Sequence, residues 1–381
     1  MNSSARRHRI AVVGPLPPYR GGIAHFTTTL LRHLHARGHE VLGVNFTRQY
    51  PDLLFPGKTQ FEAREVEVPT PSHRWLDSIS PWSWWRSGRR LRAWKPDVVV
   101  YAYWMPFFGP AYGSLLRATG RRGIRHIGLD HNAIPHEHRP GDRILGNWFL
   151  RACDAHLVLS EEVERDLRTL GVRAPIERRP HPIYDLFGDP VPRDVARRRL
   201  DIDEDARTLL FFGYVRPYKG LDVLVEALAR CRSERLQLLV VGEFYEGEQA
   251  TRARIEELGL ADRVRIHSGY VPTEEVSTWF GAADVVVQPY VTASQSGVAQ
   301  VAFQCEKPLI LTDVGGLAEI VPDGEAGLVV PPSDPDALAA AIDRFFEEDL
   351  AERLREGVLR QRKHFSWDAL VAALEGLIAS E

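Results

Sequence analysis

Two cations flank a proline in the segment FFGYVRPYKGLDVLVEAL, residues 211–228. Arg216 and Lys219 lie between an apolar run that predicts a strand and an amphipathic run that predicts a helix. The start of a helix leaves backbone N–H groups unpaired and carries the positive end of the helix dipole. Two cationic side chains at such a turn predict a site for an anion such as a diphosphate. The alternative is a pair of solvated surface cations.

Glycine-containing turns of the same kind recur along the chain. Gly21 and Gly22 follow the first apolar run, where missing side chains would let an anion approach the backbone. Their spacing is not that of the G-x-G-x-x-G dinucleotide fingerprint, and a plain loop is the alternative. Ser296 and Gly297 precede another helix, and DVGGLAEIV follows the next strand. Ligands of doubly wound sheets bind beyond the carboxyl ends of strands, so several such turns on one edge strengthen the prediction.

Short apolar runs alternate with amphipathic, helix-length segments over the whole chain. Continuous apolar runs, rather than alternating ones, are typical of parallel strands covered on both faces. The pattern predicts a doubly wound α/β fold that occurs twice, with a linker in the proline-rich segment 180–192. The strand-like runs are residues 9–14, 40–46, 97–104, 124–130, 155–160, 208–213, 236–242, 263–269, 284–289, 308–313 and 327–332.

Charge is divided unequally between the two halves. Residues 1–185 contain 27 Lys and Arg against 17 Asp and Glu, a net charge of +10, whereas the remainder carries −13. A basic half predicts contact with an anionic surface or substrate, unless charge merely drifts between domains. The three cysteines lie far apart without metal-ligand or disulfide spacing, which favours a reducing cytoplasm.

Neither of two suggestive segments predicts membrane insertion. The N-terminal MNSSARRHRIAVVG lacks the longer apolar region and cleavage site of a signal peptide. Residues 98–116 carry no charge, but their prolines and glycines predict a buried strand, a loop and a helix start rather than a spanning helix.

In order and type, the motifs resemble those of the glycosyltransferases with two Rossmann-like domains (GT-B), in the large retaining family four, also called group 1. The matching segments are GGIAHF, HN…PHE (131–137), FFGYVRPYKGLDVL, VVGEF, SGYVP, PYVTASQSGVAQVAF and TDVGGLAEIVPDGEAGLVVPPSD. They cover nearly the whole chain. The resemblance implies an acceptor-binding domain, residues 1–182, and a nucleotide-sugar-binding domain, residues 183–362, facing each other across a cleft. It also implies that a last helix, residues 363–381, packs back on the first domain.

The resemblance implies transfer of a sugar from a nucleotide donor, with retained anomeric configuration and with no metal or other cofactor. Arg216 and Lys219 would bind the donor diphosphate and stabilise charge on the departing nucleoside diphosphate, as a metal does in other enzymes. His131 would lie against the donor sugar, and these three are the expected catalytic residues. The expected donor-binding residues are Gly21, Gly22, Gly242, Glu243, Tyr270, Val271, Ser294, Ser296, Gly297, Gln300 and Glu319.

Two positions depart from the family pattern. Many members place an arginine directly after the glycine of the FG turn, where this chain has Tyr214, so Arg216 is expected to substitute. Members commonly carry two glutamates eight positions apart near TASQSGVAQVA. Here the first position is Ser294, and Gln300 is the expected stand-in for the second. A glutamine can still bond ribose hydroxyls, although it carries no charge.

Other polar residues have competing interpretations. His131 is favoured over the two histidines that follow it in IGLDHNAIPHEH, and a loop-capping role is its alternative. Glu137 would be a base only in an inverting reaction, so no protein base or nucleophile is assigned. Asp201 and Asp203 resemble a metal-binding pair, but their polar segment favours a solvated surface.

Six of the nine tryptophans lie between residues 75 and 104. Arginines are interleaved with them over residues 74–95, and Asp77 is the only acid there before Asp97. Tryptophan at the headgroup level beside arginine facing anionic lipid is typical of a segment that lies on a membrane. We predict peripheral binding to the inner face of the cell membrane through residues 74–95. The alternatives are nucleic-acid binding, or core tryptophans beside solvated arginines.

Together these features predict a cytoplasmic glycosyltransferase that builds a surface polysaccharide or glycolipid. Its donor would be a UDP-, GDP- or ADP-linked sugar, its acceptor a saccharide or a polyprenyl- or lipid-linked sugar, and no nucleic-acid partner is expected. The alternatives are a nucleotide-sugar epimerase of the same fold and a non-catalytic nucleotide-sugar-binding protein. A nicotinamide-dependent oxidoreductase would need the dinucleotide fingerprint, which is missing.

Overall fold

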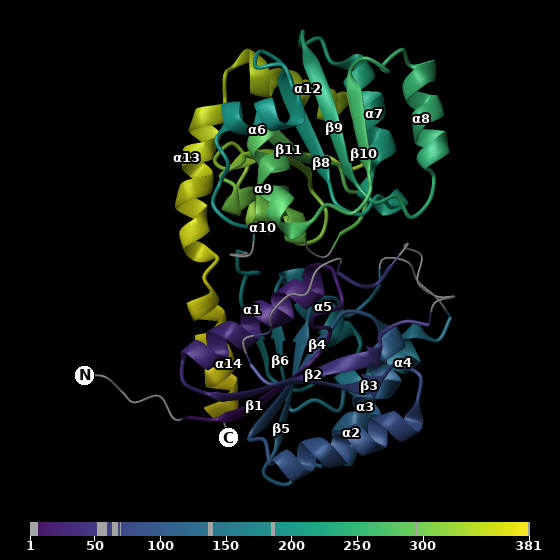
Figure 1. The fold of residues 1–381 in the computed structure, drawn as a ribbon, viewed down its shortest axis with the longest axis vertical. Coiled ribbons are helices and arrows are strands. Elements are labelled where there is room, and N and C mark those ends of the chain that lie inside the picture. Colours follow the sequence, from purple (N-terminus) through teal and green to yellow (C-terminus); the bar gives the residue numbers. More distant parts are fainter. Residues whose placement is uncertain are drawn as a thin grey trace, which may run out of the picture. The chain divides into compact units, whose positions relative to one another are not determined.

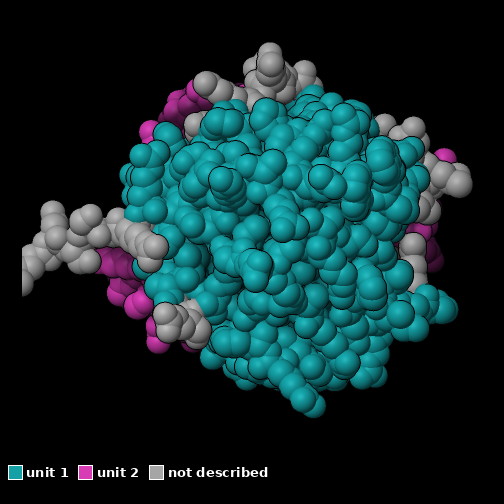
Figure 2. Space-filling view, turned by 90° about the horizontal axis from the view of Figure 1, so that it is seen from below, with its two compact units in different colours: residues 1–180, 367–381 teal, residues 181–366 magenta. Residues whose placement is uncertain are grey.

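The computed structural model describes residues 7–51, 59–62, 68, 70–135, 140–183, 187–293 and 296–379 of the 381-residue chain. The chain divides into two compact units (Figures 1 and 2), and each holds one parallel sheet with helices packed on it. Unit 1 consists of residues 1–180 and 367–381, and unit 2 of residues 181–366. The predicted doubly wound α/β fold, occurring twice, is confirmed.

The sheet of unit 1 has the strand order β3-β2-β1-β4-β5-β6-β7, and all neighbours are parallel. Its strands are β1 (Arg9–Val13), β2 (Glu40–Arg48), β3 (Ser72–Asp77), β4 (Val98–Tyr103), β5 (Arg125–Asp130), β6 (Ala155–Val158) and β7 (Ile176–Arg178). Its helices are α1 (Gly22–Ala36), α2 (Pro81–Trp94), α3 (Gly109–Thr119), α4 (Asp142–Leu150), α5 (Glu161–Thr169) and α14 (Trp367–Ala379), with the 3-10 turn η2 (Pro106–Phe108).

The sheet of unit 2 has the order β10-β9-β8-β11-β12-β13, again with parallel neighbours. Its strands are β8 (Arg207–Phe212), β9 (Leu236–Gly242), β10 (Val264–Ser268), β11 (Val285–Gln288), β12 (Leu309–Thr312) and β13 (Gly327–Val330). Its helices are α6 (Arg193–Leu200), α7 (Leu221–Arg230), α8 (Glu248–Glu257), α9 (Thr273–Ala282), α10 (Gly297–Gln304), α11 (Leu317–Ile320), α12 (Pro335–Glu347) and α13 (Ala351–Gln361), with η3 (Pro217–Lys219) and η4 (Arg362–His364).

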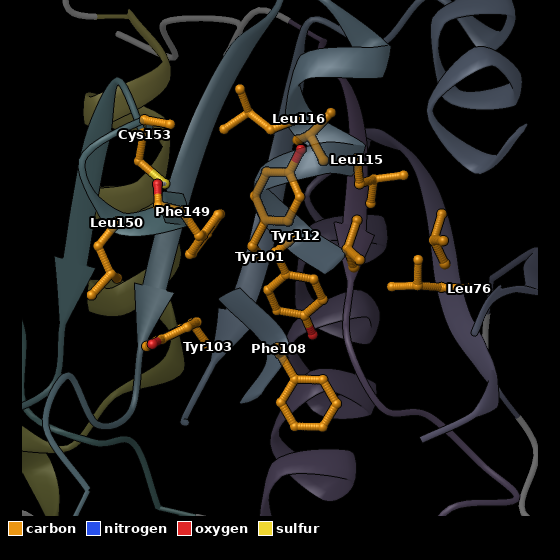
Figure 3. Packing of buried hydrophobic residues seen from close by; sticks show 14 of the residues in the cluster. Leu76, Tyr101, Tyr103, Phe108, Tyr112, Leu115, Leu116, Phe149, Leu150 and Cys153 are labelled. Carbon is orange, nitrogen blue, oxygen red and sulfur yellow. Dashed lines mark hydrogen bonds between the residues drawn. The ribbon is translucent and has the colours of Figure 1, made fainter. Parts of the chain in front are cut away.

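Aromatic side chains fill much of the core of unit 1 (Figure 3). Tyr101 of β4 lies between Tyr112 of α3 and Phe149 of α4, with ring centroids 5.6 and 5.1 Å away. The Tyr112 hydroxyl donates to the carbonyl of Ala102 at 3.1 Å, and the Tyr101 hydroxyl lies 3.0 Å from Nδ1 of His126. Burial raises the pKa of both phenols well above the usual range. The core therefore accepts Tyr101 and Tyr112 because the hydroxyl of each has a hydrogen-bond partner.

The uncharged segment 98–116 forms strand β4, the turn η2 and the first two turns of α3, and it does not form one long helix. Among the residues that the structure describes, no helix is long and apolar enough to cross a membrane.

Helix α14 belongs to unit 1 although it follows unit 2 in the chain. The ring of Trp367 stacks on that of His33 with centroids 5.2 Å apart, and it lies 4.8 Å from the ring of Phe26. The carboxylate of Glu375 approaches Nε2 of His39 to 2.9 Å. Figure 1 shows α14 lying beside α1. The last helix is therefore part of the packing of the first unit.

His181 is expected to make the fold less stable in weak acid. The residue is 6% exposed, and its Nδ1 lies 2.7 Å from the carbonyl oxygen of Pro182. Burial lowers the pKa of His181 from 6.5 to about 4. Between these values the unfolded chain binds a proton that the native chain does not. The free energy of unfolding therefore falls by up to about 3 kcal/mol as the pH drops through this range.

Thermal midpoints measured from pH 7 to pH 4 check this expectation. The His181→Asn variant should lose less of its midpoint over the range than the unchanged protein. An equal loss in both proteins would assign the acid sensitivity to other groups.

Candidate functional site

The turn between β8 and α7, residues 213–220, is fixed by neighbouring turns. The N–H of Val215 donates to the carbonyl of Glu243 at 2.9 Å, and the N–H of Val291 donates to the carbonyl of Tyr218 at 2.7 Å. The cation-bearing turn is thereby held against the segments that follow β9 and β11, whose strands flank β8 in the sheet.

Two glycines allow the backbones to meet at this edge. Gly242 has φ +149°, and a Cβ on it would overlap the carbonyl group of Gly213. Gly220 has φ +65°, and a Cβ there would overlap the carbonyl oxygen of Pro289. Only glycine combines these conformations with such close approach. The predicted turns are thus brought together by positions that exclude side chains.

Lys219 is a buried cation, with 9% of the residue exposed. Its Nζ lies 5.4 Å from the centroid of the Tyr290 ring, and no carboxylate of the described residues forms an ion pair with it. Burial lowers the pKa of Lys219, and the nearby Arg216 guanidinium lowers it further. Arg216 itself lies 5.2 Å from the centroid of the Tyr245 ring. Burying an ammonium without an anion is costly, so this arrangement favours the entry of one.

The start of α10 adds backbone donors to the same edge. Ser296 caps the helix, since its hydroxyl accepts a hydrogen bond from the N–H of Ala299 at 3.3 Å. Its side chain also hydrogen-bonds with Tyr290, whose pKa burial raises to about 12. Tyr290 therefore contacts Ser296 with its hydroxyl and faces Lys219 with its ring. A helix start at this place favours a bound anion.

All the expected catalytic and donor-binding residues of unit 2 that the structure describes, except Gln300, follow or end strands that are neighbours in the sheet. They are Tyr270 and Val271 after β10, Gly242 and Glu243 at the end of β9, Arg216 and Lys219 after β8, Ser296 and Gly297 after β11, and Glu319 after β12. Ser294 lies outside the described residues. The carboxyl edge of this sheet therefore collects them on one side, as parallel strands require.

Gln300 differs from this arrangement. Its side chain is wholly buried within α10, and neither amide atom has a hydrogen-bond partner among the described protein atoms. The same holds for Gln288 at the end of β11. A wholly buried amide does not reach ribose hydroxyls in this conformation, so the structure does not bring Gln300 to the surface of the site.

In unit 1, His131 and the Gly21–Gly22 turn meet at one sheet edge. The N–H of His131, after β5, donates to the carbonyl of Tyr103 at 2.8 Å. Its ring meets that of Phe26, in the second turn of α1, edge-on with centroids 4.8 Å apart. Gly21 has φ +110° and directly precedes α1. The carboxyl end of β5 and the start of α1 are thus held together.

A buried hydrogen-bonded pair beside His131 was not identified in the sequence analysis. Oδ2 of Asp130 lies 2.6 Å from Nδ1 of His156, and both side chains are wholly buried. Nε2 of His156 lies 3.0 Å from the carbonyl oxygen of Leu150. The sequence could have predicted this pair, because an aspartate at the end of a buried apolar strand requires a polar partner. Tyr245 and Tyr290 escaped notice as well, although each follows a strand that was predicted.

The remaining candidates are either exposed or outside the described residues. Asp201 and Asp203 are exposed on either side of the buried Ile202. No group of His, Cys, Asp or Glu that could hold a metal ion occurs in the described part of the chain. Glu137 and the two histidines beside it lie outside that part.

The sequence matches family models and known proteins. A Glycosyltransferase Family 4 model matches residues 20–184, and a Glycosyl transferases group 1 model matches residues 206–348. A D-inositol 3-phosphate glycosyltransferase of Thermomonospora curvata is 38% identical over 196 residues, which cover 48% of this chain and 44% of that protein. The chain thus spans about half the length of this relative. One of Frankia alni is 29% identical over 388 residues, 92% of each chain.

The fold is similar to that of Anabaena HepE, solved in complex with UDP-glucose, with a TM-score of 0.77 and 17% identity. The match covers 98% of this chain and 100% of HepE. Because the two family matches follow each other along the chain and each falls on one of the two parallel sheets, the chain belongs to the group 1 glycosyltransferases and has their GT-B fold.

Proposed function

We propose that this chain transfers a sugar from a nucleotide-sugar donor to a saccharide or lipid-linked acceptor. The observation that carries the proposal is the buried ammonium of Lys219, which has no carboxylate partner among the described residues. It lies beside Arg216 at the edge where the expected donor-binding turns of unit 2 gather. A nucleoside diphosphate supplies the missing negative charge.

The same groups would lower the barrier of the transfer. As the bond between the anomeric carbon and the diphosphate oxygen breaks, negative charge accumulates on the diphosphate. The ammonium of Lys219, the guanidinium of Arg216 and the N–H groups at the start of α10 stabilise that charge. Because two cations do this work, the proposal is metal-independent. In the proposed reaction the transferred sugar retains its anomeric configuration, and no protein side chain acts as a nucleophile.

Donor and acceptor classes follow from similarity and charge. HepE binds UDP-glucose, which favours a uridine donor here. The relatives named for D-inositol 3-phosphate favour a phosphorylated polyol as a second acceptor class, and the net charge of +10 over residues 1–185 suits an anionic acceptor. The proposal includes a role in surface polysaccharide or glycolipid synthesis, at the cytoplasmic side of a membrane, because a lipid-linked acceptor lies in a bilayer.

A thermal-shift panel of UDP, GDP, ADP, NAD and their sugar conjugates tests the donor. One nucleoside diphosphate at a hundred times its dissociation constant is expected to stabilise the native protein by about 2.7 kcal/mol. EDTA should leave the shift unchanged. A folded protein that responds to none of these compounds would contradict the proposal.

Product analysis with the responding donor separates the proposal from its rivals. Transfer to inositol phosphate or to a membrane extract, with retained configuration, supports the transferase. An epimerised donor formed without acceptor would identify an epimerase, and binding without any turnover would identify a non-catalytic binding protein.

A further inference from the structure

Exposed apolar side chains gather on one part of unit 1. Of the eight large apolar side chains exposed among the described residues, six lie on α2, on α4 or just before α2. Two of them are exposed more than any others in this set, Ile144 by 77% and Trp82 by 66%. These six form what we call the apolar patch: Ile79, Trp82, Trp85, Ile144, Leu145 and Trp148.

Core packing does not account for the patch. Of the six clustered tryptophans, the four others, Trp75, Trp84, Trp94 and Trp104, pack against the core of unit 1. The indole N–H of Trp84, for example, donates to the carbonyl of Asp77 at 2.6 Å. Trp82 and Trp85 instead stack on each other, with centroids 4.9 Å apart, and face outward. The membrane segment predicted over residues 74–95 is thus reduced to α2, and α4 is added to it.

A groove of about 810 Å³ between α2 and α3 adjoins the patch. Trp85 of the patch lines it, together with Arg89, Arg92 and Arg117. The guanidinium of Arg117 also lies over the ring of Trp148, 3.9 Å from its centroid. Arg117 therefore links the groove to the α4 side of the patch, so the groove and the patch form one surface.

This surface is strongly basic. Residues 78–129 contain nine Lys and Arg and one acid, Asp97. No carboxylate of the described residues forms an ion pair with Arg89 or Arg92. All three guanidinium groups line one groove, and their planar donors suit an anion such as a phosphate.

We infer that the apolar patch and the arginine-lined groove bind the surface of an anionic phospholipid bilayer. The tryptophans and Ile144 would enter the headgroup layer, and the groove would hold a lipid phosphate. Aliphatic side chains such as Ile144 and Leu145 stack poorly on bases, which favours lipid over nucleic acid. In Figure 1 helix α2 lies along the lower margin of unit 1, and Figure 2 views unit 1 from that side.

The inference rests on the proposed function only for its purpose, which is to bring the enzyme to a lipid-linked acceptor. Sedimentation with vesicles of phosphatidylglycerol and of phosphatidylcholine tests it on the full chain. Binding to phosphatidylglycerol at low salt, weakened by 0.5 M salt and absent on phosphatidylcholine, is expected. Arg92→Glu should lower the affinity about tenfold or more, and Arg89→Glu/Arg92→Glu should lower it further.

Matched variants keep the test specific. Arg173→Glu makes the same charge change at another exposed position of unit 1 and should alter vesicle binding little. Ile144→Ser should weaken binding at every salt concentration. The UDP-induced thermal shift is measured on each variant and should stay unchanged, which separates this inference from the proposed function.

Three results would overturn the inference. The first is that the protein does not bind phosphatidylglycerol vesicles, and the second is that it binds both lipids equally. The third is that Arg92→Glu and Arg173→Glu change vesicle binding by the same amount. Binding of an RNA or a protein through this surface in place of vesicles would overturn it too.

Discussion

The Lys219→Met variant is expected to lose about 10²- to 10³-fold in kcat for sugar transfer, while its ligand-free fold becomes more stable. Methionine fills similar space but removes a charge that burial penalises, as the lowered pKa of Lys219 shows. In the proposed mechanism, by contrast, the transition state loses the ammonium that would stabilise the departing diphosphate. Activity and stability should therefore change in opposite directions.

Initial rates with the donor found in the thermal-shift panel, together with thermal midpoints, check this expectation. Lys363→Met is the control, because Lys363 is an exposed lysine of η4 in the same unit. It should change neither quantity. A Lys219→Met protein with near-normal kcat, or one that loses both activity and stability, would show that Lys219 does not hold the diphosphate.

The Gly242→Ala variant is expected to lose about 3 kcal/mol or more in the free energy of unfolding. Its φ of +149° strains any other residue, and the new methyl group would overlap the backbone of Gly213. Since a backbone group cannot rotate away as a side chain can, the ends of β8 and β9 must separate. This separation would move the turn that carries Lys219, so UDP should also bind more weakly.

Thermal unfolding checks this second expectation, with a drop of about 6 to 12 °C for a unit of this size. Gly269→Ala is the matched control, because a Cβ there would have no atom within 4 Å and its backbone is unstrained. It should leave the midpoint unchanged. Equal midpoints for the two variants would mean that the β8–β9 contact tolerates a side chain.

Central strands were predictable from the sequence because they are buried on both faces. Every residue of β4 is buried, and its six residues are apolar or aromatic. The edge strands β3 and β7 were not predicted. β3 includes the exposed residues His73 and Arg74, and β7 has only three residues. Neither of these two sequences has the apolar run that marks a central strand, whereas the edge strands β10 and β13 were predicted.

The turns of the candidate site were predictable because glycine, proline and the cations lie together in the sequence. In contrast, the sequence did not predict which way a side chain points from a buried helix. Gln300 was expected at the ligand; the structure buries its side chain in α10, which the sequence did not indicate, and its contact with a ligand stays a prediction. Tyr290 and Asp130 were missed because their partners are distant in the sequence. Tyr290 contacts Lys219, and Asp130 contacts His156, each on another strand or turn.

The assignment of α14 to unit 1 bears on the order in which the protein is made. Residues 181–366 interrupt unit 1, and at ribosomal speeds they take roughly 10 to 40 s to synthesise. Throughout that time α1 lacks the indole of Trp367 that later covers Phe26 and His33. The nascent chain therefore completes its second unit while the first is still unfinished. A chaperone that binds exposed apolar surface at the ribosome would therefore bind α1 during this time.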